Sequence, residues 1–170
     1  MACLEPMLSR RQLLVASPTL PLFLALSGCK GPAVLGAPPV VSAQTQALLH
    51  AVTAEQNLIW IYNRAIAAYS ALGPALAPLR AEHEAHLAQL RGRVVEPAGM
   101  QVPGTVTSKP ALGTSTAAVL HQLRNAEQAA VTAMMGKLDG ASPSLAQLYA
   151  SIGACEATHV TVLGARIATR

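Results

Sequence analysis

The sequence predicts an all-α protein built as a bundle of four helices. Hydrophobic residues make up 52% of the 170 residues but aromatic residues only 3%, and the single Phe, Phe23, lies near the N-terminus. The core must therefore come mainly from Ala, Leu, Val, Ile and Met, and Ala has the highest helix propensity of all residues. Four segments also carry apolar residues at helical spacing, with Gly and Pro concentrated between them.

The first two helices are expected at 45–72 and 75–94, separated by a Gly-Pro pair. In the first, apolar residues recur at steps of three, four and seven and form one stripe: Leu48, Val52, Ile59, Tyr62, Ile66 and Tyr69. The second has its own stripe, which contains Leu76, Leu79, Leu87 and Leu90. Because proline fits a helix only in the first turn, Pro78 places the expected start of this helix close to Ala77.

The third and fourth helices are expected at 114–138 and from Pro143 to the C-terminus. Residues 95–113 hold three prolines and three glycines without a helical period, so they are predicted to form a loop. Asp139 and Gly140 close the third helix. Ser142 followed by Pro143 is typical of a helix start, with an N-cap residue before a proline at the first helical position.

The lengths of the connections favour one bundle topology without excluding another. Short connections make the first two helices one antiparallel hairpin and the last two another. The middle loop of 19 residues spans up to roughly 60 Å, whereas a 20-residue helix is only about 30 Å long. The loop can therefore cross the whole bundle and place the third helix parallel to the second. An up-down-up-down bundle with a slack loop stays open.

The N-terminal segment has the order of a signal peptide. Arg10 and Arg11 stand in a segment that resembles the twin-arginine export motif, an apolar stretch follows, and Leu-Ser-Gly-Cys at 26–29 matches the lipobox of bacterial lipoproteins. We expect residues 1–28 to be removed and Cys29 to carry the lipid that anchors the protein to the extracytoplasmic face of the cell membrane. Residues 29–44 then form a flexible tether and 45–170 the folded domain. Export by the general route remains an alternative.

Charge and motifs exclude several functions. The chain has 12 basic and 8 acidic residues, scattered and without interleaved aromatics, which does not indicate a nucleic-acid partner. There is no Gly-rich phosphate loop, no Cys pair with zinc-finger spacing and no nucleophile elbow. After removal of the leader, Cys155 is the one cysteine left without a lipid, and its simplest interpretation is a small buried apolar residue.

The acidic residues are few, and several lie on the apolar face of a predicted helix. Histidines lie on the same faces. Together these acidic residues and histidines are Glu55, His83, His86, Glu127, Glu156 and His159. A buried carboxylate costs on the order of several kcal/mol unless it is neutralised, hydrogen-bonded or bound to a metal. Because the same placement occurs in all four helices, we expect the groups to converge. Converging Glu and His side chains suit iron, manganese or zinc.

A short internal repeat strengthens the pattern. Ala-Glu-Gln occurs around Glu55 and again around Glu127, 72 residues later. The chain from 45 to 170 resembles the ferritin-like superfamily, in which two helices each provide one Glu and two provide Glu-x-x-His. Glu55 and Glu127 match the lone glutamates, and Glu156 with His159 matches Glu-x-x-His. The second helix departs from the family pattern.

That departure leaves two candidate pairs open in the second helix: Glu82 with His86, or His83 with His86. The resemblance implies one or two ions of iron or manganese in the core, with metal storage, Fe(II) oxidation or oxygen and peroxide chemistry as functions. The sequence is most similar to the ferritin-like domains of exported, alanine-rich lipoproteins. This resemblance assigns no catalytic residue, so whether the protein is an enzyme stays open. The alternative is a non-enzymatic envelope bundle whose core acids pair with histidines without metal. An envelope protein partner and an oligomer are compatible with either.

Overall fold

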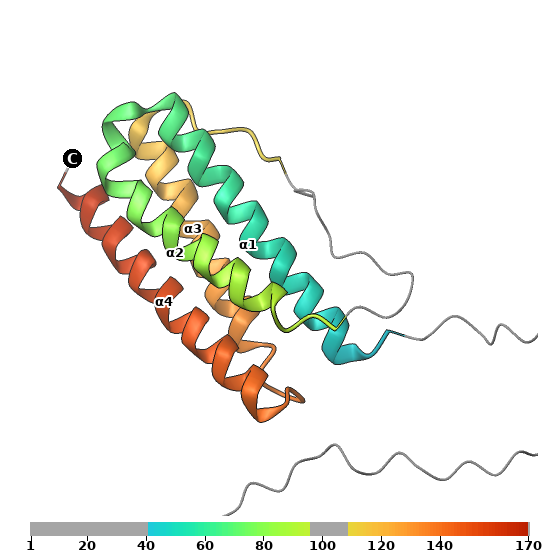
Figure 1. The fold of residues 1–170 in the computed structure, drawn as a ribbon. Helices are drawn as coiled ribbons and strands as arrows, with labels where there is room; N and C mark the ends of the chain where they lie inside the picture. Colours follow the sequence, from blue (N-terminus) through green and yellow to red (C-terminus); the bar gives the residue numbers. More distant parts are fainter. Residues whose placement is uncertain (1–40, 96–108, 170) are drawn as a thin grey trace, which may run out of the picture. The chain divides into compact units, whose positions relative to one another are not determined.

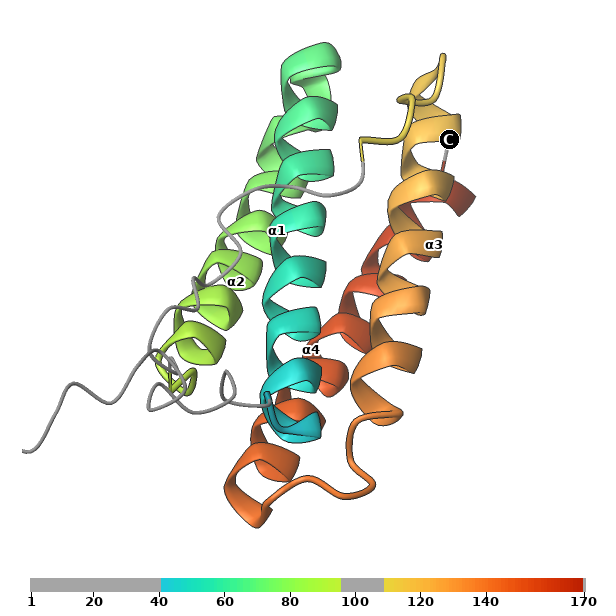
Figure 2. The same ribbon diagram turned by 90° about the vertical axis from the view of Figure 1, so that its right-hand side faces the viewer.

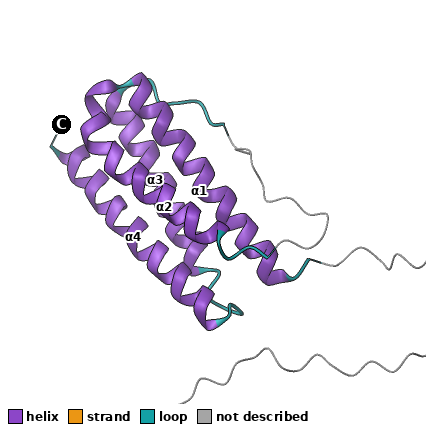
Figure 3. Cartoon of the chain, viewed as in Figure 1, coloured by secondary structure: helices purple, strands orange, loops and turns teal. Residues whose placement is uncertain are grey.

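The computed structural model describes residues 41–95 and 109–169, which form a bundle of long helices (Figure 1). These helices are α1 (Ala43–Ala68), α2 (Gly73–Arg91), α3 (Thr116–Met135) and α4 (Pro143–Ala168), with a short 3₁₀ turn, η2 (Ser70–Leu72), between α1 and α2. No strand occurs in the described residues, as the colouring in Figure 3 shows. The prediction of an all-α bundle with four helices is confirmed.

Capping serines explain where α1 and α3 begin, and a proline explains where α4 begins. The hydroxyl of Ser42 accepts a hydrogen bond from the backbone N–H of Thr45 at 3.1 Å, and Ser115 does the same for Ala118 at 3.2 Å. Each satisfies one of the N–H groups that the first turn of a helix leaves without a partner. In α4 the first helical residue is Pro143, whose missing N–H costs nothing at that position.

The apolar core consists of two clusters, one toward each end of the bundle. The cluster at the first end is made of Ile61, Tyr62, Ala65, Leu72, Leu76, Leu79, Val119, Leu120, Leu123 and Leu163. The cluster at the second end is made of Leu48, Ala51, Val52, Leu90, Met134, Leu145, Leu148, Tyr149 and Ile152. The beginnings of α2 and α3 therefore lie at the same end, and both helices run in the same direction (Figure 2).

Two details of the helices differ from expectation. Gly73 begins α2 instead of lying between helices, so Pro78 lies in the second turn and is exposed there. The buried face of α1 is also wider than the expected stripe: Leu58 and Ile61 are buried, whereas Ile59 and Ile66 are only half-buried. The reason is that a straight helix completes one turn every 3.6 residues. A stripe with a strict seven-residue repeat therefore rotates gradually away from the core-facing side.

The predicted leader, with Arg10 and Arg11, and the lipidation site Cys29 lie outside the described residues. Of the predicted tether, 29–44, only residues 41–44 are described, and α1 already begins within them at Ala43. Among the helices of the described residues, none combines the length and apolar character needed to cross a membrane. Export and lipid anchoring thus stay predictions from the sequence.

Candidate metal site in the bundle core

Acidic and imidazole side chains from all four helices meet between the two apolar clusters. Their members are Glu55 of α1, His83 and His86 of α2, Glu127 of α3, and Glu156 and His159 of α4. We call this group the core cluster. Both glutamates of the internal repeat, Glu156 and His83 are fully buried, and the other two histidines are at most 8% exposed. Along every helix the cluster lies between residues of the two apolar groups, so its members share one height in the bundle.

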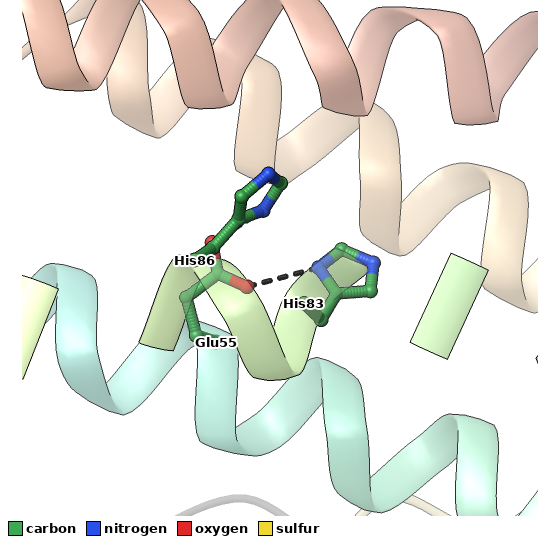
Figure 4. Close-up of side chains that lie close together, drawn as sticks. All are labelled: Glu55, His83 and His86. Atoms are coloured by element: carbon green, nitrogen blue, oxygen red, sulfur yellow. Dashed lines mark hydrogen bonds and ion pairs between the residues drawn. The ribbon is translucent and has the colours of Figure 1, made fainter. Parts of the chain in front are cut away.

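His83 is the centre of the core cluster. Its Nδ1–H donates to Oε2 of Glu55 at 2.9 Å, and its Nε2–H donates to Oε1 of Glu127 at 2.8 Å. Figure 4 shows the first of these bonds, with the carboxylate of Glu55 beside the ring of His86 as well. Burial alone would lower the pKa of His83, but the hydrogen bonds and charges of Glu127 and Glu55 outweigh it and raise the pKa to about 10. The protonated ring thus links two helices, α1 and α3, through their carboxylates.

Glu55 and Glu127 are ionised despite their burial. Burial acts to raise the pKa of Glu127, but the nearby imidazoles of His159 and His83, the charge of His83 and the Tyr62 hydroxyl lower it to about 2. The pKa of Glu55 is lowered in the same way by His83 and His86, against the effect of burial. Tyr62 donates its hydroxyl to the Glu127 oxygen that also accepts from His83, at 2.5 Å. Burial and the neighbouring charge of Glu127 raise the pKa of Tyr62, so it remains a donor.

Glu156 behaves differently from the other two glutamates. Burial and the charges of Glu55 and Glu127 raise its pKa to about 8, and its contact with the Glu55 carboxylate acts in the same direction. At neutral pH it is therefore a neutral carboxylic acid in the core. The cluster holds two carboxylates, one carboxylic acid and a protonated imidazole close together.

Several atoms of the core cluster that could act as metal ligands have no hydrogen-bond partner. They are Oε1 of Glu55, Oε2 of Glu127, both carboxyl oxygens of Glu156, and the Nδ1 atoms of His86 and His159. Nδ1 of His86 lies 3.5 Å from Oε1 of Glu55, and Nδ1 of His159 lies 3.4 Å from Oε1 of Glu127, in each case without hydrogen-bond alignment. Folded proteins leave few buried polar atoms without a partner. Such a concentration of unpaired polar atoms at one place is compatible with a bound cation.

The distances within the cluster fit a metal ion. Two donors at about 2.1 Å from one ion lie about 3.0 Å apart at a right angle and about 3.4 Å apart at a tetrahedral angle. The four nitrogen–oxygen distances just given, from 2.8 to 3.5 Å, lie in this range or within about 0.2 Å of it. Glu55 with His83 and His86 forms one triad of donor atoms within 4.8 Å of one another, and His83 with Glu127 and His159 forms a second. These buried groups could hold a metal ion.

Of the two candidate pairs in α2, the structure places His83 and His86 in the core cluster. Their spacing is three residues. Glu82, the other sequence candidate, does not join the core cluster, because its side chain is 53% exposed. It turns to α4 instead, where its Oε2 accepts from Nε2 of His159 at 2.6 Å. The neighbour at i−1 of a core-facing residue lies about 100° around the helix, at the edge of the buried face.

One sequence expectation about a single residue is wrong. Cys155 is not a plain buried apolar residue: it is half-buried, and its thiol donates to Glu82 at 3.1 Å. Tyr62, a member of the predicted stripe, is fully buried, and its hydroxyl donates to Glu127, a contact that the sequence did not predict. Its position seven residues after Glu55, on the same face, is the signal that could have placed it near the cluster. His50 and His121 are exposed and lie outside the core cluster.

Comparison of the chain with protein-family models, curated proteins and solved structures gave no match.

Proposed function

We propose that this protein is a lipid-anchored ferritin-like bundle of the cell envelope that binds one or two ions of iron or manganese in the core cluster. The proposal depends on six buried oxygen and nitrogen atoms that could bind a metal. They come from all four helices and have no hydrogen-bond partner. Carboxylate and imidazole donors without thiolate are those that iron and manganese use in proteins. The lipid anchor on Cys29 and the extracytoplasmic location rest on the sequence alone.

The directions of the helices support the ferritin-like part of the proposal. α2 and α3 begin at the same end and run in the same direction. Two antiparallel hairpins related in this way are the arrangement of ferritin-like folds, in which a long crossover joins them.

The chain's own residues would hold the ions in two triads on either side of His83. Nδ1 of His83 faces the triad with Glu55 and His86, and Nε2 faces the triad with Glu127 and His159. A ring nitrogen has to lose its proton before it can bind an ion, so metal binding would release protons. The apolar clusters above and below exclude water from the site. A bound iron or manganese ion would supply redox and Lewis-acid chemistry.

Metal binding tests the proposal directly. The purified protein is stripped with a chelator and dialysed against Mn(II), or against Fe(II) without oxygen, and bound metal is measured. We expect one or two ions per chain, and Glu55→Gln and Glu127→Gln should each weaken binding by about tenfold or more, since even second-layer changes cost that much. His50→Gln and His121→Gln are matched controls, because both histidines are exposed. If the wild type binds no more metal than a variant that carries both Glu55→Gln and Glu127→Gln, the proposal is wrong.

One observation favours a second candidate, a metal-free bundle that serves as a binding or structural partner in the envelope. His83 already bonds both ionised glutamates and supplies a positive charge between them. In that case the core cluster is a buried ion-pair network that fixes the packing of the helices. Absence of metal binding, with circular dichroism unchanged in the stripped protein, would support this candidate.

A further inference from the structure

A second group of potential ligands lies at the surface between α2 and α4. It consists of Glu82, Cys155 and His159, and we call it the outer triad. Nε2 of His159 donates to Oε2 of Glu82 at 2.6 Å, and the thiol of Cys155 donates to the same oxygen at 3.1 Å. The sulfur lies 3.7 Å from Nε2 of His159. Sulfur, nitrogen and oxygen donors thus meet at one point.

The geometry suits a cation in place of two protons. The S–H and the N–H both point at one carboxylate oxygen, so the two protons occupy the space between the three donor atoms. With bonds of about 2.3 Å to sulfur and 2.0–2.1 Å to nitrogen, a tetrahedral ion separates its two ligands by about 3.5 Å. The observed sulfur–nitrogen distance of 3.7 Å is close to this value. Only Glu82 has to move outward, and its side chain is 53% exposed.

We propose that Glu82, Cys155 and His159 form a metal site of their own, which binds a thiophilic divalent cation such as Zn²⁺ through Oε2, Sγ and Nε2, with water completing the coordination. Binding replaces the thiol proton and the Nε2 proton, both of which pass to solvent, and no group is oxidised or reduced. The outer triad differs from the core cluster in containing a sulfur donor and in being open to solvent. It does not depend on metal binding in the core.

The two groups share His159 but use different atoms of its ring. Nε2 belongs to the outer triad, whereas Nδ1 faces Glu127 at 3.4 Å. The two sites lie on opposite edges of one imidazole. An ion on Nε2 leaves the neutral ring with its one proton on Nδ1, where it faces Glu127, so His159 is a ligand of one site at a time. This arrangement also separates the two proposals experimentally, because Glu82 and Cys155 contribute no atom to the core triads.

A nucleophilic role for Cys155 is a weaker explanation of the same contacts. Burial, together with the hydrogen bond and charge of Glu82, raises the pKa of the Cys155 thiol to about 12. A nucleophilic cysteine needs the opposite environment, with positive charge that favours the thiolate. A bound cation would provide that charge and convert the thiol into a ligand.

Cobalt(II) is the probe that distinguishes the outer triad from the core cluster. A thiolate bound to Co(II) gives an intense near-ultraviolet charge-transfer band, which oxygen and nitrogen ligands do not give. The full-length protein is reduced, stripped of metal and titrated with Co(II), and competition with Zn²⁺ is measured on the same band. We expect the band in the wild type, its loss in Cys155→Ser, and at least about tenfold weaker binding in Glu82→Gln.

Matched variants make each outcome decisive. Glu84→Gln is the control for Glu82, because Glu84 is an equally exposed neighbour that pairs with Arg80 at 3.4 Å. Glu55→Gln, which acts on the core cluster, should keep the band and its Co(II) affinity. Absence of the band in the correctly folded wild type, or equal affinity in the Glu82 and Glu84 variants, overturns the proposal. Cobalt bound without the band would indicate core binding alone, which supports the proposed function and contradicts the outer site.

Discussion

The two helical hairpins contribute matching parts to the core cluster, with one exception. In the first hairpin Glu55 of α1 lies 3.5 Å from His86 of α2, and in the second Glu127 of α3 lies 3.4 Å from His159 of α4. The exception is the residue three positions before each histidine. It is His83 in α2, with both nitrogens bonded, and Glu156 in α4, with neither oxygen bonded.

That single difference changes the charge balance of the core. A glutamate in place of His83 would leave four carboxyl groups facing one another, which only bound cations or protons could neutralise. With histidine there, the chain itself provides a positive charge between Glu55 and Glu127. In the first hairpin the protons on His83 therefore occupy the place that the proposed metal ion would take, whereas the second hairpin adds the neutral acid Glu156.

The largest expected effect comes from removing the exceptional histidine. His83→Gln leaves two buried carboxylates without their cation, so we expect the free energy of unfolding of the metal-free protein to fall by about 3–5 kcal/mol. Glu156→Gln, the matched change in the other hairpin, removes an acid that burial already keeps neutral and should leave stability unchanged or raised at neutral pH. Urea unfolding in the presence of chelator measures both. Equal losses in the two variants would show that His83 is not the internal cation.

The pH dependence of stability sharpens the same comparison. The pKa of Glu156 is raised from 4.5 to about 8, so its contribution to the stability of the metal-free protein is complete below pH 4.5 and is lost as pH rises toward 8. The pKa of His83 is raised from 6.5 to about 10, and its contribution is lost later, as pH rises from 6.5. The loss due to Glu156 should be on the order of a few kcal/mol.

Glu156→Gln is the variant that separates the two titrations. It should abolish the decrease in unfolding free energy between pH 4.5 and 6.5 and keep the decrease above 6.5, because His83 is unchanged. Unfolding curves recorded across this range for both proteins test the assignment. A wild type whose stability is constant from pH 4.5 to 8 would contradict the neutral state of Glu156. On the acid side, the lowered pKa of Glu127 predicts a loss of stability as pH falls from 4.5 toward 2.

The smallest expected effect concerns Tyr62, whose hydroxyl forms a hydrogen bond between the two hairpins. Tyr62→Phe removes the hydroxyl that donates to Glu127, and a hydrogen bond to a charged group contributes about 1.5–3 kcal/mol. Tyr149→Phe is the control, since the Tyr149 hydroxyl is buried without a hydrogen-bond partner and its removal should be neutral or stabilising. Thermal and urea unfolding compare the two. If the Tyr149 variant loses as much stability as the Tyr62 variant, the bond to Glu127 contributes nothing specific.

Much of the fold follows from local sequence signals. The apolar spacing, the serines that cap α1 and α3, and the proline that opens α4 act within one or two helical turns, so the helices could be predicted to within a few residues. The start of α2 could not, because Pro78 was expected to lie in the first turn but lies in the second. A proline near a helix start removes a single hydrogen bond, and burial of Leu76 and Leu79 on the same face favours the longer helix.

The sequence by itself determined that acids and imidazoles face the interior, since the positions of Glu55, Glu127 and Glu156 on apolar stripes depend only on the helical period. Only the tertiary structure decided which groups touch. It placed His83 instead of Glu82 in the core, brought Tyr62 to Glu127, and turned Glu82 toward Cys155. The physical reason is that periodicity fixes which side of a helix a residue occupies, whereas partners and their pKa values depend on how helices distant in sequence are rotated and aligned against one another.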